Sequence, residues 1–159
     1  MPNWIEGTMK LRGKQKDIRR FFQKGLDPSS WPNPKDCVDQ VVDRSDDREL
    51  YFEIKNEPHI AGTRRAFITD ESAYMSEESG VVCVNVKQAW VFCAGSESND
   101  LKEWESISDK YNVDIKLYGI ESGMEFTQEV IIIRGKKPIV NETKYDDWDW
   151  ECPFPNMGG

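Results

Sequence analysis

The run from residue 81 to residue 135 constrains the fold of this 159-residue chain more than any other part. Its first segment, residues 81–93, is rich in β-branched and aromatic side chains that alternate with polar ones. Such alternation is typical of a strand that buries one of its faces. The residues expected on the buried face are Val82, Val84, Val86, Trp90 and Phe92. We therefore predict a long strand at the start of this run.

A helix is expected after this strand. Asn99 or Asp100 is a suitable N-cap, and Glu103 stands three residues after Asp100, in the position of a capping box. Apolar residues then recur at helical spacing, namely Leu101, Trp104, Ile107 and Tyr111. The pattern predicts an amphipathic helix whose Trp104 contributes to the core.

A hairpin completes the run. Residues 113–120 and 125–134 have the composition of two strands, and Phe126 is expected to be buried in the second. The turn between them contains Gly123, which we expect to supply the positive φ of a tight hairpin. The run is thus predicted as β-α-β-β.

The N-terminal third repeats the pattern on a smaller scale. Residues 8–12 alternate like a strand, and a helix is expected over about residues 15–24, ended by Gly25. Shorter strands are expected at residues 50–55 and 66–69. Two strand-helix units that feed one mostly antiparallel sheet, with both helices on one face, predict an α+β domain of the ferredoxin-like class.

The length of the chain fits one domain with a self-sufficient core. We expect residues 1–140 to form that domain, with loop insertions at 27–47 and 56–80, and residues 141–159 to form an acidic, aromatic tail. No apolar run approaches the roughly 20 residues of a membrane span, and the first residues lack a signal-peptide core. A cytoplasmic protein with no membrane contact is therefore expected. Its four cysteines, Cys37, Cys83, Cys93 and Cys152, form no Cys-x-x-Cys pair and are expected to be free thiols.

Charge is unevenly distributed along the chain. Residues 1–24 hold seven Lys or Arg and two Asp or Glu, a net charge of +5. Because the whole chain carries −8, residues 25–159 carry −13. The protein is therefore predicted to consist of a basic first unit on an acidic body.

The C-terminal tail combines acidic and aromatic residues. Five carboxylates stand between residues 142 and 151 against the single Lys144. One interpretation is a solvated terminus whose aromatic side chains pack against the domain. The other is a recognition element, because Trp and Tyr often anchor interfaces and carboxylates beside them suit a basic partner. The candidate partner-binding residues are Asp146, Asp147, Trp148, Asp149, Trp150 and Glu151.

Residues that would carry out catalysis are hard to find in this chain. His59 is the only histidine and stands in an expected loop, so a zinc site built on several histidines is not expected. The sequence also lacks the nucleophile-elbow, P-loop and dinucleotide-binding motifs. We therefore expect no catalytic residues, no metal site, no bound cofactor and no enzymatic activity.

Nucleic-acid binding is the alternative function. A pI near 4.8 opposes phosphate binding by the whole body, and the RNP1 pattern of RNA-recognition modules is missing. Only the basic first unit could contact a phosphate backbone. The candidate residues are Lys14, Lys16, Arg19 and Arg20.

Several short motifs resemble the Api-like proteins, a family of small ferredoxin-like accessory proteins of phages and plasmids. The opening residues 1–4 (MPNW) and 7–13 (GTMKLRG) are similar to the start of that family. Residues 88–90 (QAW) and 121–126 (ESGMEF) are similar to its later half, and residues 62–68 (GTRRAFI) resemble an internal motif of some members. The resemblance extends over residues 1–135, and the acidic, aromatic tail lies outside it. Members often carry cysteine at the position of Ile5, so no thiol function is carried over to this chain.

The resemblance implies an accessory protein of a mobile element that acts in the bacterial host cytoplasm, from a family with no established reaction. Small acidic phage proteins frequently inhibit host defence by presenting carboxylates where a nuclease binds phosphates. Our leading hypothesis is a non-catalytic, phage-encoded protein-binding module, an anti-CRISPR or anti-restriction inhibitor that binds a host nuclease with a basic groove. The alternative is a nucleic-acid-binding accessory protein that uses the basic N-terminal unit.

Overall fold

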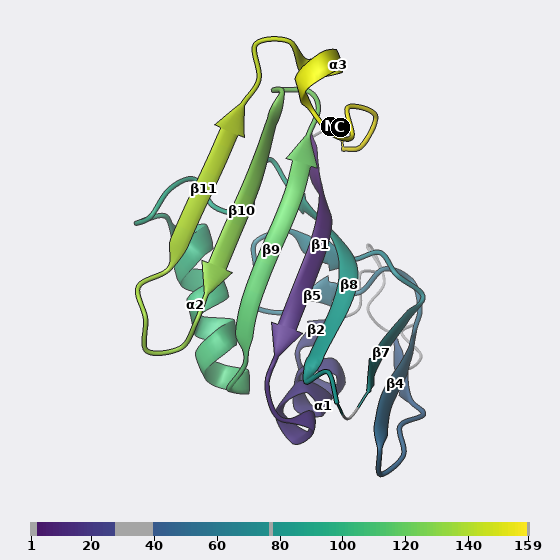
Figure 1. Cartoon of the computed structure of the whole chain (residues 1–159). Coiled ribbons are helices and arrows are strands. Elements are labelled where there is room, and N and C mark those ends of the chain that lie inside the picture. Colours follow the sequence, from purple (N-terminus) through teal and green to yellow (C-terminus); the bar gives the residue numbers. More distant parts are fainter. Residues whose placement is uncertain (1–2, 28–39, 77, 159) are drawn as a thin grey trace.

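The computed structural model describes residues 3–27, 40–76 and 78–158, and a wide antiparallel sheet dominates it (Figure 1). The eight strands of this sheet lie in the order β11-β10-β9-β1-β8-β6-β5-β2. Their bounds are β1 (Trp4–Arg12), β2 (Leu26–Asp27), β5 (His59–Ile60), β6 (Ala66–Ile68), β8 (Val81–Ala89), β9 (Asp114–Glu121), β10 (Phe126–Ile132) and β11 (Ile139–Lys144). All neighbouring strands run antiparallel.

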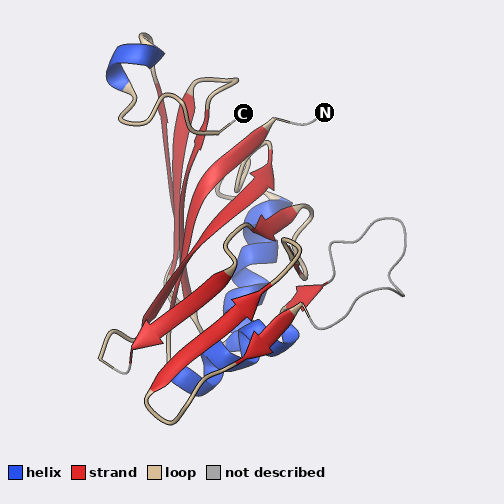
Figure 2. Cartoon of the chain, turned by 90° about the vertical axis from the view of Figure 1, so that its right-hand side faces the viewer, coloured by secondary structure: helices blue, strands red, loops and turns tan. Residues whose placement is uncertain are grey.

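A second sheet and two helices complete the core. The second sheet has the order β3-β4-β7, formed by β3 (Val41–Asp43), β4 (Glu49–Ile54) and β7 (Ser72–Ser76). Helices α1 (Gln15–Lys24) and α2 (Asn99–Tyr111) cover the same face of the large sheet (Figure 2). Helix α1 also contacts the second sheet, because the ring of Phe22 stacks on that of Phe52 at a centroid distance of 4.5 Å. We call the other face of the large sheet, turned away from α1 and α2, the open face.

Strand β1 lies at the centre of the large sheet, paired with β8 on one side and β9 on the other. The pairing with β9 places Gly7 opposite Gly119. A Cβ atom on Gly7 would lie 1.9 Å from the carbonyl oxygen of Tyr118, so any other residue at this position would disturb the backbone pairing. The N-terminal strand is therefore the element that joins the two halves of the sheet.

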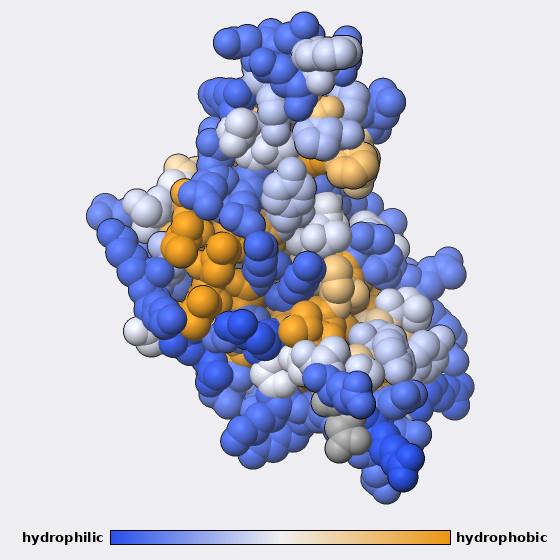
Figure 3. All heavy atoms as spheres, in the orientation of Figure 1, coloured by the Kyte–Doolittle hydropathy of each residue, from blue (hydrophilic) through white to orange (hydrophobic). Residues whose placement is uncertain are grey.

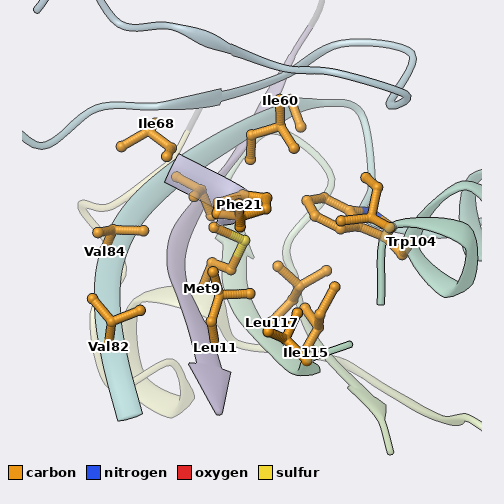
Figure 4. Close-up of a cluster of buried hydrophobic side chains, with 14 of the residues drawn as sticks. Met9, Leu11, Phe21, Ile60, Ile68, Val82, Val84, Trp104, Ile115 and Leu117 are labelled. Atoms are coloured by element: carbon orange, nitrogen blue, oxygen red, sulfur yellow. The ribbon is translucent and has the colours of Figure 1, made fainter. Parts of the chain in front are cut away.

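The main hydrophobic core lies between the large sheet and the two helices (Figure 4). Met9 and Leu11 of β1, Val82 and Val84 of β8, and Ile115 and Leu117 of β9 meet Phe21 of α1 and Trp104 of α2 there. The indole of Trp104 is fully buried, and its Nε1 donates a hydrogen bond to Oε1 of Gln88 at 3.2 Å. The predicted burial of Trp104 and Phe126 is thus confirmed.

The predicted small two-helix ferredoxin-like domain is wrong. The chain is 42% strand and 19% helix, and its strands form an eight-stranded and a three-stranded sheet. The difference arises where strands were not predicted. Strand β11 extends the large sheet beyond β10, and the expected insertion at 56–80 contributes β5 and β7 in addition to β6, the short strand expected at 66–69. Of the insertion at 27–47, residues 28–39, which include Cys37, lie outside the described residues, and the remainder contains β3.

The strand predicted at residues 81–93 ends earlier, at Ala89. Trp90 adopts a positive φ of 73° and is 45% exposed, so the prediction that it belongs to the core is wrong. The alternation of side chains stops there because the backbone leaves the sheet toward α2. Phe92 and Cys93, just beyond this turn, are buried.

The predicted N-cap of α2 and the predicted hairpin glycine both differ from what the structure shows. Ser98 caps α2, and its side chain accepts a hydrogen bond from the backbone N–H of Leu101, so Asn99 and Asp100 are not the caps. In the hairpin between β9 and β10, Glu125 and not Gly123 has the positive φ, at 58°. A Cβ atom on Gly123 would lie 2.5 Å from Nδ2 of Asn3, so a larger residue there would require that side chain to move.

None of the helices in the described part of the chain is long and apolar enough to cross a membrane.

Candidate interaction surface

The chain from Tyr145 to Gly158, which we call the C-terminal segment, is packed against one end of the large sheet. It contains the one-turn helix α3 (Trp148–Glu151). Trp148 is its anchor, 9% exposed and packed in a small cluster with Ile120 and Cys152. The indole Nε1 of Trp148 also donates a hydrogen bond to the carbonyl oxygen of Pro155 at 3.0 Å. This cluster is separate from the main core.

Hydrogen bonds hold the C-terminal segment at both of its ends. At its start, the backbone N–H of Tyr145 donates to the carbonyl oxygen of Glu125 at 3.2 Å. At its end, Oγ of Ser122 donates to the carbonyl oxygen of Gly158 at 2.7 Å. Gly158 lies so close to the sheet that a Cβ atom on it would be 2.2 Å from the carbonyl oxygen of Ile120. The segment thus forms a closed loop over the end of β9.

Glu151 stabilises α3 from within. Its Oε2 accepts hydrogen bonds from the backbone N–H groups of Asp146, at 3.2 Å, and Asp147, at 3.3 Å. These N–H groups precede the helix and have no partner inside it, and a carboxylate at a helix N-terminus is electrostatically favourable. Glu151 is therefore a structural residue of the segment.

Trp150 points into solvent and is 86% exposed, more than any other large apolar residue in the described chain. It lies two residues after Trp148, and because successive helical residues are about 100° apart, the two indoles point in opposite directions. The side chains of Asp146, Asp147 and Asp149 are exposed around it. Helix α3 lies on the open-face side of the sheet, opposite α1 and α2 (Figure 2). The segment therefore presents an indole among carboxylates on an anchored support.

The six candidate residues of the tail thus separate into two groups. Trp148 is buried and Glu151 caps α3, so both support the segment. The four that a partner could reach are Asp146, Asp147, Asp149 and Trp150. Trp148 packs against the domain, as the first interpretation of the tail expects, whereas Trp150 faces solvent and the recognition role stays a prediction.

The four basic candidates of α1 are not equally available. Nε of Arg19 lies 3.1 Å from Oδ2 of Asp43. Burial alone would raise the pKa of Asp43, but hydrogen bonds with Ser45 and the charge of Arg19 outweigh it and lower that pKa. Asp43 therefore stays ionised and neutralises Arg19.

Arg20 is also engaged by the fold. It donates a hydrogen bond to the carbonyl oxygen of Lys110 at 2.9 Å, and its Cζ lies 5.9 Å from the ring centroid of Tyr111. Lys14 and Lys16 remain exposed, with no ion-pair partner in the described part of the chain. Only two of the four basic candidates thus offer an uncommitted charge.

Buried Gln128 and the backbone around Cys93 satisfy each other's hydrogen bonds. Oε1 of Gln128 accepts hydrogen bonds from the backbone N–H groups of Phe92 and Cys93, at 3.0 and 3.1 Å, and its Nε2 donates to the carbonyl oxygen of Cys93 at 2.8 Å. Burial raises the pKa of the Cys93 thiol, which keeps it protonated and a poor nucleophile. Cys83, Cys93 and Cys152 are free thiols. Residues 3–27, 40–76 and 78–158 contain no group of three or more His, Cys, Asp or Glu side chains that could hold a metal ion.

The sequence did not point to a pocket of about 170 Å³ on the open face. Its lining combines apolar side chains with basic ones, namely Val81, Ile115, Ile131, Ile132 and Ile133 with Lys10, Arg12, Lys116 and the acidic Asp114. In the view of Figure 3, apolar side chains gather on this face in areas separated by polar ones. The signal was the alternation within β1, which puts Lys10 and Arg12 on the face opposite Met9 and Leu11. This alternation alone could not predict the pocket, because the sequence does not show that this face of the sheet is left uncovered by α1 and α2.

Comparison of the chain with models of known protein families, with curated proteins and with solved structures gave no significant match.

Proposed function

We propose that this protein is a non-catalytic protein-binding module whose C-terminal segment docks on a basic surface of its partner. The observation that carries the proposal is the 86% exposure of Trp150, which closely follows the exposed Asp147 and Asp149 in the chain, on a segment anchored by Trp148. An indole held in water loses the hydrophobic stabilisation that it would gain in a partner's pocket. Tryptophan is also among the residues that contribute most to binding energy at interfaces.

The anchored support favours tight binding for an entropic reason. Ordering a flexible chain on binding costs free energy, and a segment that is already folded avoids most of that cost. The hydrogen bonds of Tyr145 and Ser122, together with buried Trp148, hold the segment before any partner arrives. The net charge of −8 further increases the rate of encounter with a basic partner.

A basic groove that normally binds phosphates would fit this surface, because exposed carboxylates can take the places of phosphate oxygens. We therefore extend the proposal to an anti-defence inhibitor that acts on a CRISPR or restriction nuclease, as the resemblance to mobile-element accessory proteins implies. Support for nucleic-acid binding through α1 is weaker. Arg19 and Arg20 are engaged within the fold, so of the four candidates only Lys14 and Lys16 would be free to contact phosphates.

The test is inhibition of DNA cleavage by a panel of purified restriction endonucleases and CRISPR nucleases. We expect the intact chain to inhibit at least one of them, and Trp150→Ala to weaken that inhibition by at least about tenfold. Trp90→Ala is the matched control, because it removes another exposed tryptophan at the same end of the sheet and should leave inhibition unchanged. Inhibition that is equal for Trp150→Ala and the wild type would contradict the proposed surface, and no inhibition of any nuclease would contradict the anti-defence role.

Binding of labelled DNA and RNA tests the alternative. Salt-dependent binding that is lost in Lys14→Glu/Lys16→Glu would establish the basic unit as a nucleic-acid site. We expect no such binding from the wild type.

A further inference from the structure

The pocket on the open face lies at the opposite end of the sheet from the C-terminal segment. Asp114, the first residue of β9, lines the pocket, whereas the segment packs on Ile120 near the end of the same strand. Lys116 also lines the pocket, so four residues of extended strand, or about 13 Å, separate it from Ile120. Both sites lie on the same side of the sheet, because α3 projects on the open-face side (Figure 2).

The pocket has the size of one side chain. Its volume of about 170 Å³ is below the roughly 300–1,000 Å³ typical of small-molecule sites. It is comparable to cavities of about 150 Å³ that admit a benzene ring. Apolar side chains such as Val81 and Ile131 line it, so an apolar or aromatic group from another protein is a better match than a polar metabolite.

The rim of the pocket is basic, although the chain as a whole carries a net charge of −8. Arg12 is paired with Asp114 at 2.8 Å, and Lys116 with Glu129 at 2.7 Å. Lys10 is exposed and has no ion-pair partner in the described residues, so it leaves an uncompensated positive charge beside the pocket. The fitting side chain is therefore an aromatic one with carboxylates next to it.

We propose that the occupant of this pocket is Trp150 of a second copy of the chain, with Asp149 of that copy facing Lys10. The exposed indole matches the size and lining of the pocket, and its acidic neighbours match the basic rim. This contact between two copies is an additional function of Trp150, and it does not depend on the proposed binding to a host protein. It also gives the exposed indole a place to be buried when no other partner is bound.

Because the pocket and the C-terminal segment lie at opposite ends of the same face, two copies can satisfy both contacts at once, and the assembly is a dimer. When two open faces meet in antiparallel orientation, the C-terminal segment of each copy lies over the pocket of the other. The contact is then made twice around a two-fold axis, which is the commonest symmetry of protein dimers. Two weak contacts reinforce each other in such an arrangement, because the second forms within an already assembled pair. Self-association would also hide Trp150, so dimerisation would compete with any partner that binds the same indole.

The experiment is sedimentation of the purified full chain over a wide range of concentrations, at low and at physiological salt. We expect the average mass to rise from 18.4 kDa toward twice that value as concentration increases. Trp150→Ala, Lys10→Glu and Asp149→Lys should each weaken the dimer by at least about tenfold. Trp90→Ala is the matched control and should dimerise like the wild type. All four positions are exposed, so thermal unfolding is expected to be unchanged and would detect a folding defect.

A charge exchange gives the sharpest test. In Lys10→Glu and Asp149→Lys chains mixed together, each copy carries the surface that the other requires, so the mixture should form heterodimers more tightly than either variant dimerises alone. The double variant should dimerise by itself. A wild type that stays monomeric at every concentration and salt would overturn the proposal. Dimerisation that survives both Trp150→Ala and Lys10→Glu would overturn it as well, because another surface would then form the dimer. Failure of the charge exchange to restore association would exclude the pairing of Lys10 with Asp149.

Discussion

Replacing Trp148 by alanine should release the C-terminal segment from the sheet while the rest of the protein stays folded. Trp148 is 9% exposed, and an aromatic side chain buried to this degree removes roughly 150–250 Å² from water. At ~25 cal/mol per Å², its burial contributes about 4–6 kcal/mol. The hydrogen bond from its indole to Pro155 adds about 1 kcal/mol.

The remaining contacts of the segment are too few to replace this contribution. The bonds from Tyr145 to Glu125 and from Ser122 to Gly158 are each worth about 1 kcal/mol. Trp148 is not part of the main core, so its loss is expected to affect the segment and not the two sheets.

Hydrogen exchange of the backbone amides measures this release directly. The N–H groups of Tyr145, Cys152 and Met157 all donate hydrogen bonds in the folded segment, and their protection should disappear in Trp148→Ala. Trp150→Ala is the matched control, since it removes a tryptophan two residues away that is 86% exposed, and its exchange should resemble that of the wild type. Wild-type protection of these three amides in Trp148→Ala would refute the assignment of Trp148 as the anchor. Loss of protection throughout β1 and β9 would refute the claim that the segment is energetically separate.

Three further predictions concern the scaffold. Gly119→Ala would place a Cβ atom 2.6 Å from the ring of buried Phe92, so it should lower the free energy of unfolding by about 1–3 kcal/mol, and an unchanged melting temperature would contradict this packing. Burial alone would raise the pKa of Asp114, but the hydrogen bond from Arg12 leads the effects that lower it below the ordinary 3.8. The ionised Asp114 therefore stabilises the fold above its unfolded-state pKa, and this stabilisation is lost as pH falls through its folded-state pKa. Below about pH 4, urea unfolding should show a smaller decrease in the free energy of unfolding for Asp114→Asn than for the wild type. Cys83 is exposed, so Cys83→Ala should remove one rapidly modified thiol in a titration with a disulfide reagent, and an unchanged count would contradict its accessibility.

Much of the secondary structure could be predicted because it depends on neighbours in the chain. Four elements lie within a residue or two of their expected positions, namely α1, α2, β9 and β10. Their periodicity follows directly from which side chains are buried, so it can be read from the sequence. Strand β7 was missed because only Ala73 and Met75 in it are buried, too few to distinguish it from a polar loop.

The candidate surface shows the same division. The sequence by itself determined that aromatic and acidic side chains alternate near the C-terminus, and that Lys10 and Arg12 share one side of a strand. It could not determine which tryptophan is buried, because Trp148 and Trp150 have similar neighbours and only the docking of α3 on Ile120 distinguishes them. Nor could it show that β1 pairs with both β8 and β9 at the centre of a wide sheet with an open face. Pairing partners and exposed faces follow from contacts between residues far apart in the chain, whose free energy is realised only when the whole sheet has formed.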